Sequence, residues 1–377
     1  MNILVAPDKF RGSLEAVEVC RAIEEGILLA FPSADITSVP LADGGEGTAE
    51  ILTRQAFGTK LKAEVRDPLG RLIEASYGIS KNKKTAFIEM AAASGLSLLT
   101  IEEHNPLLAN TYGTGELIKH ALDQGVQEII LGIGGSATTD GGTGMAAALG
   151  YRFYNEKNLL IEPNGASLIE IQSIDSTYAD PRLNAVQITV ACDVTNPLTG
   201  LNGAAYIYGP QKGASPEMVK MLDNGLRKLA EIATETFGEN VSQNPGAGAA
   251  GGLGAGCLWF LNAVLKDGTS IVMEQTRLGQ LIENADLVIT GEGKVDEQTL
   301  NGKVVKGLAD YCQKSGVPLA VVCGTLQITP EQVRAAGMTY AVSVLNRPMD
   351  LNVAQKEAFD LVKDATFHLV RLFFSNR

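Results

Sequence analysis

The chain has 377 residues, of which 45% are hydrophobic and 20% are charged. This composition is typical of a soluble globular protein, and the length is typical of about two domains. The formal net charge is −12 at pH 7 and lysines and arginines form no cluster. These features exclude a protein that binds nucleic acid or an anionic membrane, because both partners require a basic surface. An anionic ligand must therefore be held by a few local groups.

Targeting and cysteine usage predict a cytoplasmic protein. The first apolar segment, Ile3–Ala6, follows Met1 almost directly and leaves no room for a signal peptide. The uncharged segment Val241–Leu265 is interrupted by glycines and a proline, so it is unsuited to cross a membrane. The five cysteines are widely spaced and form no C-x-x-C pair. This spacing favours free thiols and argues against a zinc site.

Five apolar segments have the pattern of buried parallel strands: Ile3–Ala6, Ile36–Leu41, Ile129–Ile133, Leu287–Thr290 and Leu319–Cys323. We expect them to lie in one parallel sheet. Right-handed crossovers place the carboxyl ends of such strands at one edge, which is where open α/β sheets bind ligands. The polar loops that follow these strands should therefore meet in one cleft.

A different pattern begins at Lys60. Polarity alternates from Lys60 to Ser80 around the turn Asp67–Gly70, which predicts a β-hairpin that does not belong to a parallel sheet. Ala185–Cys192 is a further buried strand, and Ser215–Phe237 is an amphipathic helix. We therefore predict an α/β fold with two domains, one built on a parallel sheet and one of mixed α/β structure inserted in it.

The predicted parallel-sheet domain is discontinuous and comprises residues 1–58, 108–150 and 275–377. The inserted mixed domain comprises residues 59–107 and 151–274. We expect the inserted domain to cover the cleft of the first domain.

The segment Gly132–Met145, GIGGSATTDGGTGM, joins a predicted strand to a helix. Glycines allow a ligand to approach the backbone closely, and free N–H groups at the start of a helix stabilise an anion. The alternative is a tight crossover that needs glycine only for packing. We predict that this loop binds phosphate through Gly134, Gly135, Ser136, Thr138 and Thr139.

Carboxylates and lysines follow the other strands, at Asp8-Lys9, Asp43 and Glu292–Asp296. Carboxylates that hold Mg²⁺, lysines that neutralise charge and a glycine-rich loop are the groups that phosphoryl transfer from ATP requires. The P-loop pattern G-x-x-x-x-G-K-[ST] and the protein-kinase motifs are absent. The sequence therefore predicts a kinase outside both common classes.

The general base is predicted from chain position. Asp193 follows a strand of the covering domain, so it would reach the acceptor hydroxyl from the side opposite the nucleotide. Asp43 would position the acceptor, and these two roles are exchangeable. Each aspartate could instead cap a turn, and Asp193 before Thr195-Asn196-Pro197 suits an Asx-turn.

The metal and phosphate groups are assigned in the same way. Asp140 and Asp296 are the predicted Mg²⁺ ligands, because Asp140 lies beside the glycine loop and Asp296 shares a loop with a lysine. Lys9 and Lys294 are predicted to neutralise phosphate or carboxylate charge, although either could be a solvated side chain.

Two further residues are predicted to contact the substrate. Ser13 lies where a helix N-cap is expected, so its hydroxyl either caps the helix or binds a ligand. Arg66 flanks the hairpin turn and could grip a carboxylate, with a solvated surface charge as the alternative.

Six stretches resemble the type-1 family of bacterial glycerate kinases: APDKFRGSLEA, PLADGGEGT, GIGGSATTDGGTGM, ACDVTNPLTGLNGAAYIYGPQKGA, GAGAAGGLGAG and ADLVITGEGKVDEQTLNGKV. The similarity runs along nearly the whole chain in the same order. It implies phosphorylation of D-glycerate by ATP with Mg²⁺, with 2-phosphoglycerate as the expected product. It also implies that the larger of the two α/β domains is flavodoxin-like, a Rossmann-like arrangement.

Two other functions compete with the kinase. Residues 246–251 match G-x-G-x-x-G, the dinucleotide fingerprint, which would suggest an NAD-dependent oxidoreductase of a small hydroxy acid. The fingerprint requires a preceding strand, and the segment before it is polar and turn-like. A non-catalytic cytosolic protein that binds small acids is the second competitor. The oligomeric state is not predicted.

Overall fold

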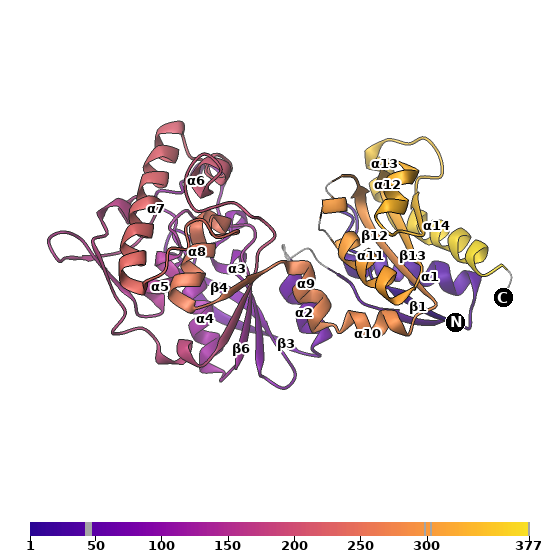
Figure 1. The fold of residues 1–377 in the computed structure, drawn as a ribbon, viewed down its shortest axis with the longest axis horizontal. Coiled ribbons are helices and arrows are strands. Elements are labelled where there is room, and N and C mark those ends of the chain that lie inside the picture. Colours follow the sequence, from indigo (N-terminus) through magenta and orange to yellow (C-terminus); the bar gives the residue numbers. More distant parts are fainter. Residues whose placement is uncertain (42–46, 298, 302–303, 376–377) are drawn as a thin grey trace. The chain divides into compact units, whose positions relative to one another are not determined.

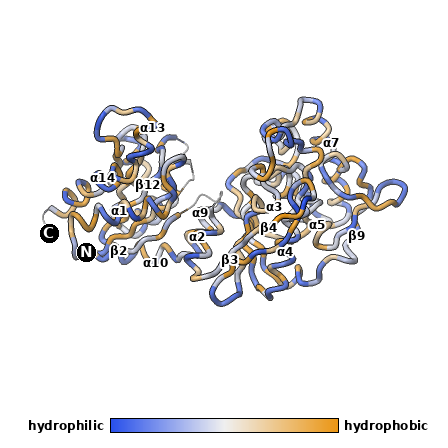
Figure 2. Tube along the Cα trace, turned by 180° about the vertical axis from the view of Figure 1, so that it is seen from behind, coloured by the Kyte–Doolittle hydropathy of each residue, from blue (hydrophilic) through white to orange (hydrophobic). Residues whose placement is uncertain are grey.

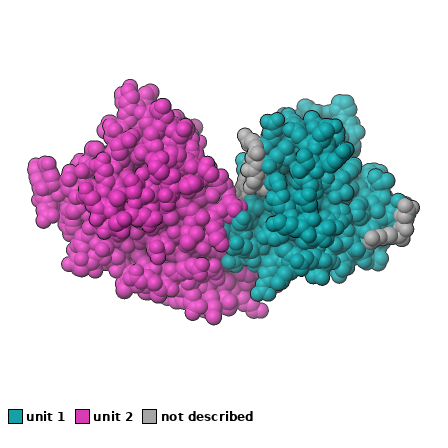
Figure 3. All heavy atoms as spheres, in the orientation of Figure 1, with its two compact units in different colours: residues 1–43, 269–377 teal, residues 44–268 magenta. Residues whose placement is uncertain are grey.

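The structure is a computed structural model that describes residues 1–41, 47–297, 299–301 and 304–375. The chain forms two compact units (Figure 3). Unit 1 comprises Met1–Asp43 and Thr269–Arg377, and unit 2 comprises Gly44–Gly268. Unit 2 is therefore inserted between the two segments of unit 1, as predicted.

Unit 1 contains a parallel sheet whose strand order is β14-β13-β12-β1-β2 (Figure 1). The strands are β1 (Asn2–Val5), β2 (Asp35–Ser38), β12 (Leu287–Val295), β13 (Leu319–Leu326) and β14 (Tyr340–Ser343). When the strands of this unit are counted by themselves, the order is 2-1-3-4-5, which is the flavodoxin-like arrangement. The expected flavodoxin-like sheet is confirmed, but it belongs to unit 1, which is the smaller of the two units and not the larger one as expected.

Helices cover both faces of this sheet. The helices are α1 (Ala16–Ala30), α9 (Gly268–Gln275), α10 (Leu278–Glu283), α11 (Val304–Ser315), α12 (Pro330–Ala335), α13 (Leu351–Lys356) and α14 (Ala358–Phe373). α1 and α14 share one core with Ile3, Val5 and Val322 of the strands. Both helices carry hydrophobic and hydrophilic residues along their length (Figure 2), as expected for helices with one buried face.

Unit 2 is built on a mixed sheet with the order β11-β10-β6-β5-β4-β3. The strands are β3 (Thr59–Arg66), β4 (Leu72–Ile79), β5 (Thr85–Glu89), β6 (Glu128–Gly132), β10 (Gln187–Ala191) and β11 (Val264–Lys266). Pairing is antiparallel from β3 to β5 and parallel from β5 to β11. The predicted hairpin is confirmed, with Gly70 at a φ of +85° in its turn.

A small antiparallel sheet, β8-β7-β9, seven α-helices and five short 3₁₀ helices complete the described part of unit 2. The small strands are β7 (Arg152–Tyr154), β8 (Leu160–Ile161) and β9 (Ser173–Asp175). The helices are α2 (Thr48–Gln55), α3 (Ala91–Ser94), α4 (Tyr112–Asp123), α5 (Thr143–Ala148), α6 (Ala204–Tyr208), α7 (Pro216–Phe237) and α8 (Ala249–Leu261).

The placement of the Ile129–Ile133 strand was predicted incorrectly. This strand, β6, pairs with β5 and β10 in the sheet of unit 2, and not with β1. Residues 108–150 consequently lie in unit 2, and so do residues 44–58, whereas residues 269–274 lie in unit 1. An apolar run identifies a buried parallel strand, but it carries no information about which of two parallel sheets receives it.

Candidate active site

The glycine loop runs from the end of β6 to the start of α5. Gly134 and Gly135 are exposed, and Gly135 has a φ of +74°, a backbone conformation that favours glycine. Two hydrogen bonds hold this part of the loop on the segment after β5. The N–H of Leu96 donates to the carbonyl of Gly135 at 2.8 Å, and the N–H of Ala137 donates to the carbonyl of Ser94 at 3.0 Å.

The loop presents polar groups that no described residue satisfies. The backbone N–H groups of Gly134, Gly135 and Ser136 donate to no acceptor among the described residues. The side-chain hydroxyls of Thr138 and Thr139 are fully buried and have no hydrogen-bond partner there. Buried polar groups are nearly always paired, so these orphaned groups indicate a place for a ligand or an ordered water. The N–H groups suit an anion.

Lys212, which is not among the predicted site residues, contacts this loop from the stretch ACDVTNPLTGLNGAAYIYGPQKGA. Its side chain is fully buried, and Nζ donates to Oγ of Ser136 at 2.7 Å and to the carbonyl of Thr138 at 2.5 Å. Burial lowers the pKa of Lys212 to about 7, while the charge of Asp140 opposes this shift. When protonated, this lysine places a positive charge 2.7 Å from the hydroxyl oxygen of Ser136, the residue that follows the exposed Gly134 and Gly135.

The buried lysine predicts an unusual pH dependence of stability. In the unfolded chain a lysine keeps its proton up to a pH of about 10.4. The folded protein releases the Lys212 proton near pH 7. The unfolded state therefore binds more protons between these values, and the free energy of unfolding should rise with pH relative to that of Lys212→Met. Denaturant unfolding of both proteins across this range measures the difference, and a constant difference would refute the lowered pKa.

Asp140 is fully buried, and the two oxygens of its carboxylate accept four hydrogen bonds. Oδ2 accepts from the N–H and Oγ1 of Thr111 at 2.8 and 2.7 Å and from the N–H of Gly144 at 3.1 Å. Oδ1 accepts from the N–H of Gly142 at 3.1 Å. Burial raises the pKa of Asp140, and the hydrogen bonds oppose that rise. The carboxylate thus ties the glycine loop to the start of α4, which leaves few lone pairs for a metal ion.

The second glycine-rich segment packs against the first. A Cβ on Gly251 would lie 2.0 Å from the carbonyl of Thr138, and one on Gly256 would lie 2.4 Å from the carbonyl of Gly141. The N–H of Gly141 also donates to the carbonyl of Gly251 at 3.1 Å. These glycines of residues 246–256 therefore allow close backbone packing. The segment follows helix α7 rather than a strand, so it lacks the context of a dinucleotide fingerprint.

Unit 1 gathers a separate group of charged residues at the carboxyl ends of β1 and β12. Asp8 is buried, and its N–H donates to the carbonyl of Gly291 at 2.8 Å, next to Glu292. The neighbouring Lys9 is partly buried. Oε1 of Glu292 accepts from Oγ1 of Thr299 at 2.6 Å. This is the point where the strand order reverses, the usual ligand position in such sheets.

Two of the predicted residues on β12 and the loop after it pair with each other. Nζ of Lys294 lies 2.9 Å from Oδ2 of Asp296. The Lys294 side chain is about half exposed, at 54%, whereas that of Asp296 is 21% exposed. The segment after β1 thus lies beside the last part of β12, whereas Asp43 after β2 lies outside the described residues and the glycine loop belongs to the other unit and its own sheet.

Ser13 does not cap helix α1. Its Oγ donates to the carbonyl of Phe10 at 3.0 Å, and the N-cap is Glu15, which forms a capping box with Glu18. The N-cap expectation is wrong because residues 10–14 form a tight turn before the helix. Ser13 does line a cavity of about 270 Å³, together with Arg11 and Gln355.

Arg66 is held by other residues of unit 2. Its N–H donates to Glu116 at 2.6 Å, its guanidinium pairs with the same carboxylate, and the guanidinium lies 4.6 Å from the ring centroid of Tyr112. It also lines a cavity of about 600 Å³ with Arg152 and Tyr178. The contact with a substrate carboxylate stays a prediction, because the structure contains no substrate.

Of the two candidate bases, Asp193 lies in the described part of the chain and Asp43 does not. Asp193 is exposed after β10, and Oδ1 accepts from the N–H of Gly268 at 2.7 Å, at the start of α9. Asp43 lies outside the described residues. The roles of both residues stay predictions.

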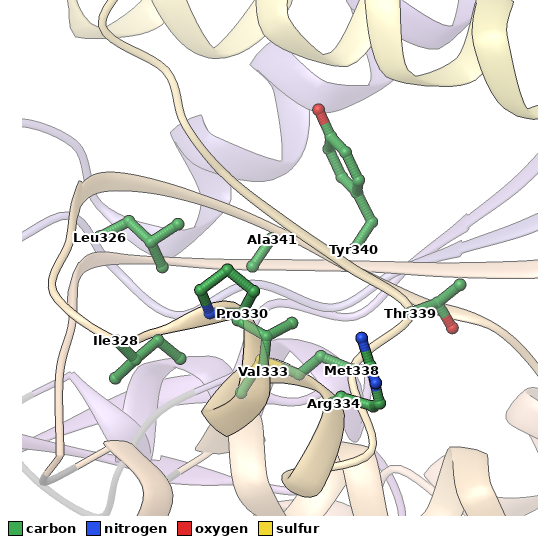
Figure 4. A pocket seen from close by; sticks show the side chains of 9 residues that line it. All are labelled: Leu326, Ile328, Pro330, Val333, Arg334, Met338, Thr339, Tyr340 and Ala341. Carbon is green, nitrogen blue, oxygen red and sulfur yellow. The ribbon is translucent and has the colours of Figure 1, made fainter.

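The described residues were also searched for a further cavity, a metal-binding group and a membrane-spanning helix. A cavity of about 320 Å³ beside β14 and α12 is lined mostly by apolar side chains such as Ile328 and Val333, and none of the predicted residues lines it (Figure 4). Within the described ranges no three histidine, cysteine or acidic side chains are grouped to hold a metal ion. No described helix is long and apolar enough to span a membrane.

Comparison with known proteins decides the family. A model described as "Glycerate kinase family" matches residues 3–374. The chain belongs to the glycerate kinase family. It is 47% identical over 360 residues to "Glycerate 2-kinase" of Escherichia coli, covering 96% of this chain and 94% of that protein. It is 46% identical over 358 residues to "Glycerate kinase" of Bacillus cereus, covering 95% of this chain and 94% of that protein.

A solved structure gives the same result. The crystal structure described as "putative glycerate kinase 2 from Salmonella typhimurium LT2" has a TM-score of 0.91 and 43% identity, and the match covers all of this chain and 98% of that one. Membership of the glycerate kinase family confirms the expectation of a kinase. It also removes the grounds for an NAD-dependent oxidoreductase, because the glycines behind that alternative serve packing.

Proposed function

We propose that this glycerate kinase transfers the γ-phosphoryl group of ATP to D-glycerate and forms 2-phosphoglycerate. The observation that carries the proposal is the family match along residues 3–374, supported by relatives named for this activity. The relative from Escherichia coli is named a glycerate 2-kinase, which supports transfer to the 2-hydroxyl. The glycine loop adds a physical basis for holding the phosphates.

The chemistry needs little from the protein beyond position and charge. The transferred phosphoryl group carries negative charge that must be stabilised while the acceptor oxygen approaches in line. The N–H groups of Gly134, Gly135 and Ser136 supply donors for that charge, and Lys212 supplies a positive charge behind them. Lys9 and Lys294 of unit 1 remain proposed as further neutralising groups.

Mg²⁺ is proposed as the ion that accompanies ATP. This ion prefers carboxylate oxygens and phosphates and usually keeps several waters, so one or two carboxylates suffice. Asp296 and Glu292 fit that requirement better than Asp140, whose oxygens already accept four hydrogen bonds. The ion would neutralise phosphate charge there.

The proposed function is tested by release of ADP over a panel of small hydroxy acids, with ³¹P NMR of the product. We expect turnover with D-glycerate only, loss of turnover in excess EDTA and recovery with added Mg²⁺. A product phosphorylated at the 3-hydroxyl would correct the regiochemistry alone. Equal turnover without glycerate, or full activity in EDTA, would contradict the proposal.

Asp193 remains the proposed general base. Asp193→Asn keeps the side-chain oxygen that accepts from the N–H of Gly268 but removes the basic carboxylate. We expect kcat to fall at least about 100-fold with little change in ATP affinity. Initial rates and ATP binding measured on the same preparation test this. If Asp193→Asn stays active and Asp43→Asn is inactive, the two roles are reversed.

A further inference from the structure

The contact between Lys212 and Ser136 determines the direction in which the serine hydroxyl points its proton. When Lys212 is protonated its amine has only donors, so in the 2.7 Å contact Nζ donates and Oγ of Ser136 accepts. The hydroxyl proton of Ser136 must then point to a different acceptor. None of the described residues offers one to it.

Three backbone donors at and beside Ser136 have no acceptor among the described residues. The backbone N–H of Ser136 and those of the exposed Gly134 and Gly135 have no acceptor among the described residues. Ser136 itself is 8% exposed, so its hydroxyl lies just below the surface of the loop. An oxygen with acceptor capacity only, such as that of an ionised phosphate, would satisfy these donors together.

We propose that Lys212 is a positioning residue that makes the Ser136 hydroxyl a donor to the phosphate oxygens of the nucleotide. This proposal rests on the proposed function, in which the glycine loop holds phosphate groups. Lys212 does not contact the phosphate in this role. It acts through Ser136 and through the charge that it places behind the loop.

A purely structural role for Lys212 makes the opposite prediction for stability. Its second hydrogen bond, to the carbonyl of Thr138, could by itself brace the loop. However, burying a protonated amine is unfavourable, and in Lys212→Met the relief of this cost offsets the loss of the hydrogen bonds to Ser136 and to the Thr138 carbonyl. If the lysine is retained for ligand binding, Lys212→Met should fold at least as stably as the wild type while binding anions poorly.

The experiment is a double-mutant cycle measured by binding rather than by turnover. Wild type, Lys212→Met, Ser136→Ala and the double variant are titrated with ADP and with pyrophosphate in a calorimeter, and their melting temperatures are recorded. Lys220→Met, on the exposed surface of α7, removes the same charge from the same unit and serves as the matched control.

We expect each single substitution to weaken ADP binding about tenfold or more, because hydrogen bonds to a charged phosphate oxygen are stronger than those between neutral groups. The double variant should bind little more weakly than the weaker single variant, because both changes remove one linked interaction. Lys220→Met should bind as the wild type does. The melting temperature of Lys212→Met should not fall.

Two results would overturn the proposal. Additive losses in the double variant would show that Lys212 does not act through Ser136, and a large drop in melting temperature with unchanged ADP affinity would show a structural brace.

Failure of the proposed function would give different results. If the wild type binds ADP but does not phosphorylate glycerate, the assumed substrate is wrong while the cycle still decides the role of Lys212. If the wild type binds neither ADP nor pyrophosphate, both proposals fall.

Discussion

Asp140→Asn is expected to lower the free energy of unfolding by about 2–4 kcal/mol. The asparagine amide has one accepting oxygen, so whichever way it points, at least one of the buried donors from Thr111, Gly142 or Gly144 faces an NH₂ group. Each buried donor left unsatisfied costs about 1–3 kcal/mol, and the remaining bonds lose their charge assistance. Denaturant unfolding without added metal measures the loss.

This result separates two roles for Asp140. A carboxylate that serves as a Mg²⁺ ligand would give a variant with nearly normal stability in EDTA and a raised Mg²⁺ requirement. A carboxylate that ties the loop to α4 gives a variant that is destabilised with or without the ion. Asp364→Asn, at an exposed position of α14, is the control for the same chemical change. A normal melting temperature for Asp140→Asn would return Asp140 to the list of metal ligands.

Gly135→Val is expected to abolish turnover, with activity reduced at least about 100-fold, while the protein stays folded. Valine at a φ of +74° is strained, and its Cβ would lie 3.3 Å from Cβ of Ala91. The loop would have to change its backbone conformation to relieve this strain. The N–H groups of Gly134 and Ser136 would then point away from a bound phosphate. Initial rates and ADP binding, with circular dichroism as a folding check, test the prediction.

Gly125→Val is the matched control for Gly135→Val. Gly125 has a φ of +77° and no atom within 4 Å of its added Cβ, so it reproduces the backbone strain away from the loop. Both variants should lose similar stability, of about 1–3 kcal/mol, but only the variant at Gly135 should lose activity. Equal activity of the two variants, or an unfolded Gly135→Val, would support a loop that needs glycine only for packing.

Local patterns were sufficient for most of the elements and for the fold class. Alternating polarity around Asp67–Gly70 correctly predicted the hairpin, and helical periodicity after Ser215 and Pro216 correctly predicted α7. These elements were predictable because each depends on residues near in sequence. The glycine loop was predictable for the same reason, since a strand, its glycines and the following helix are contiguous.

The assignment of strands to sheets was not predictable from local patterns. β1 and β6 are both short apolar parallel strands, yet they lie in different sheets because strand pairing depends on residues that are far apart in the chain, such as Ile3 of β1 and Leu287 of β12. The prediction that Ser13 caps helix α1 was wrong for a local reason. The tight turn of residues 10–14 uses that hydroxyl locally, and Glu15 takes the cap.

The sequence by itself determined the family, an α/β fold with an inserted domain, and a glycine loop suited to an anion. Only the tertiary structure showed that the buried side chains of Lys212 and Asp140 contact that loop. Lys212 is 76 residues from Ser136 in the chain, and a single lysine between Gln211 and Gly213 has no local signature of burial. Thr111 reaches Asp140 across 29 residues in the same way. Such contacts form only when helices and loops pack. Packing buries Lys212 and Asp140 beside the loop, and this burial shifts the pKa values of both side chains.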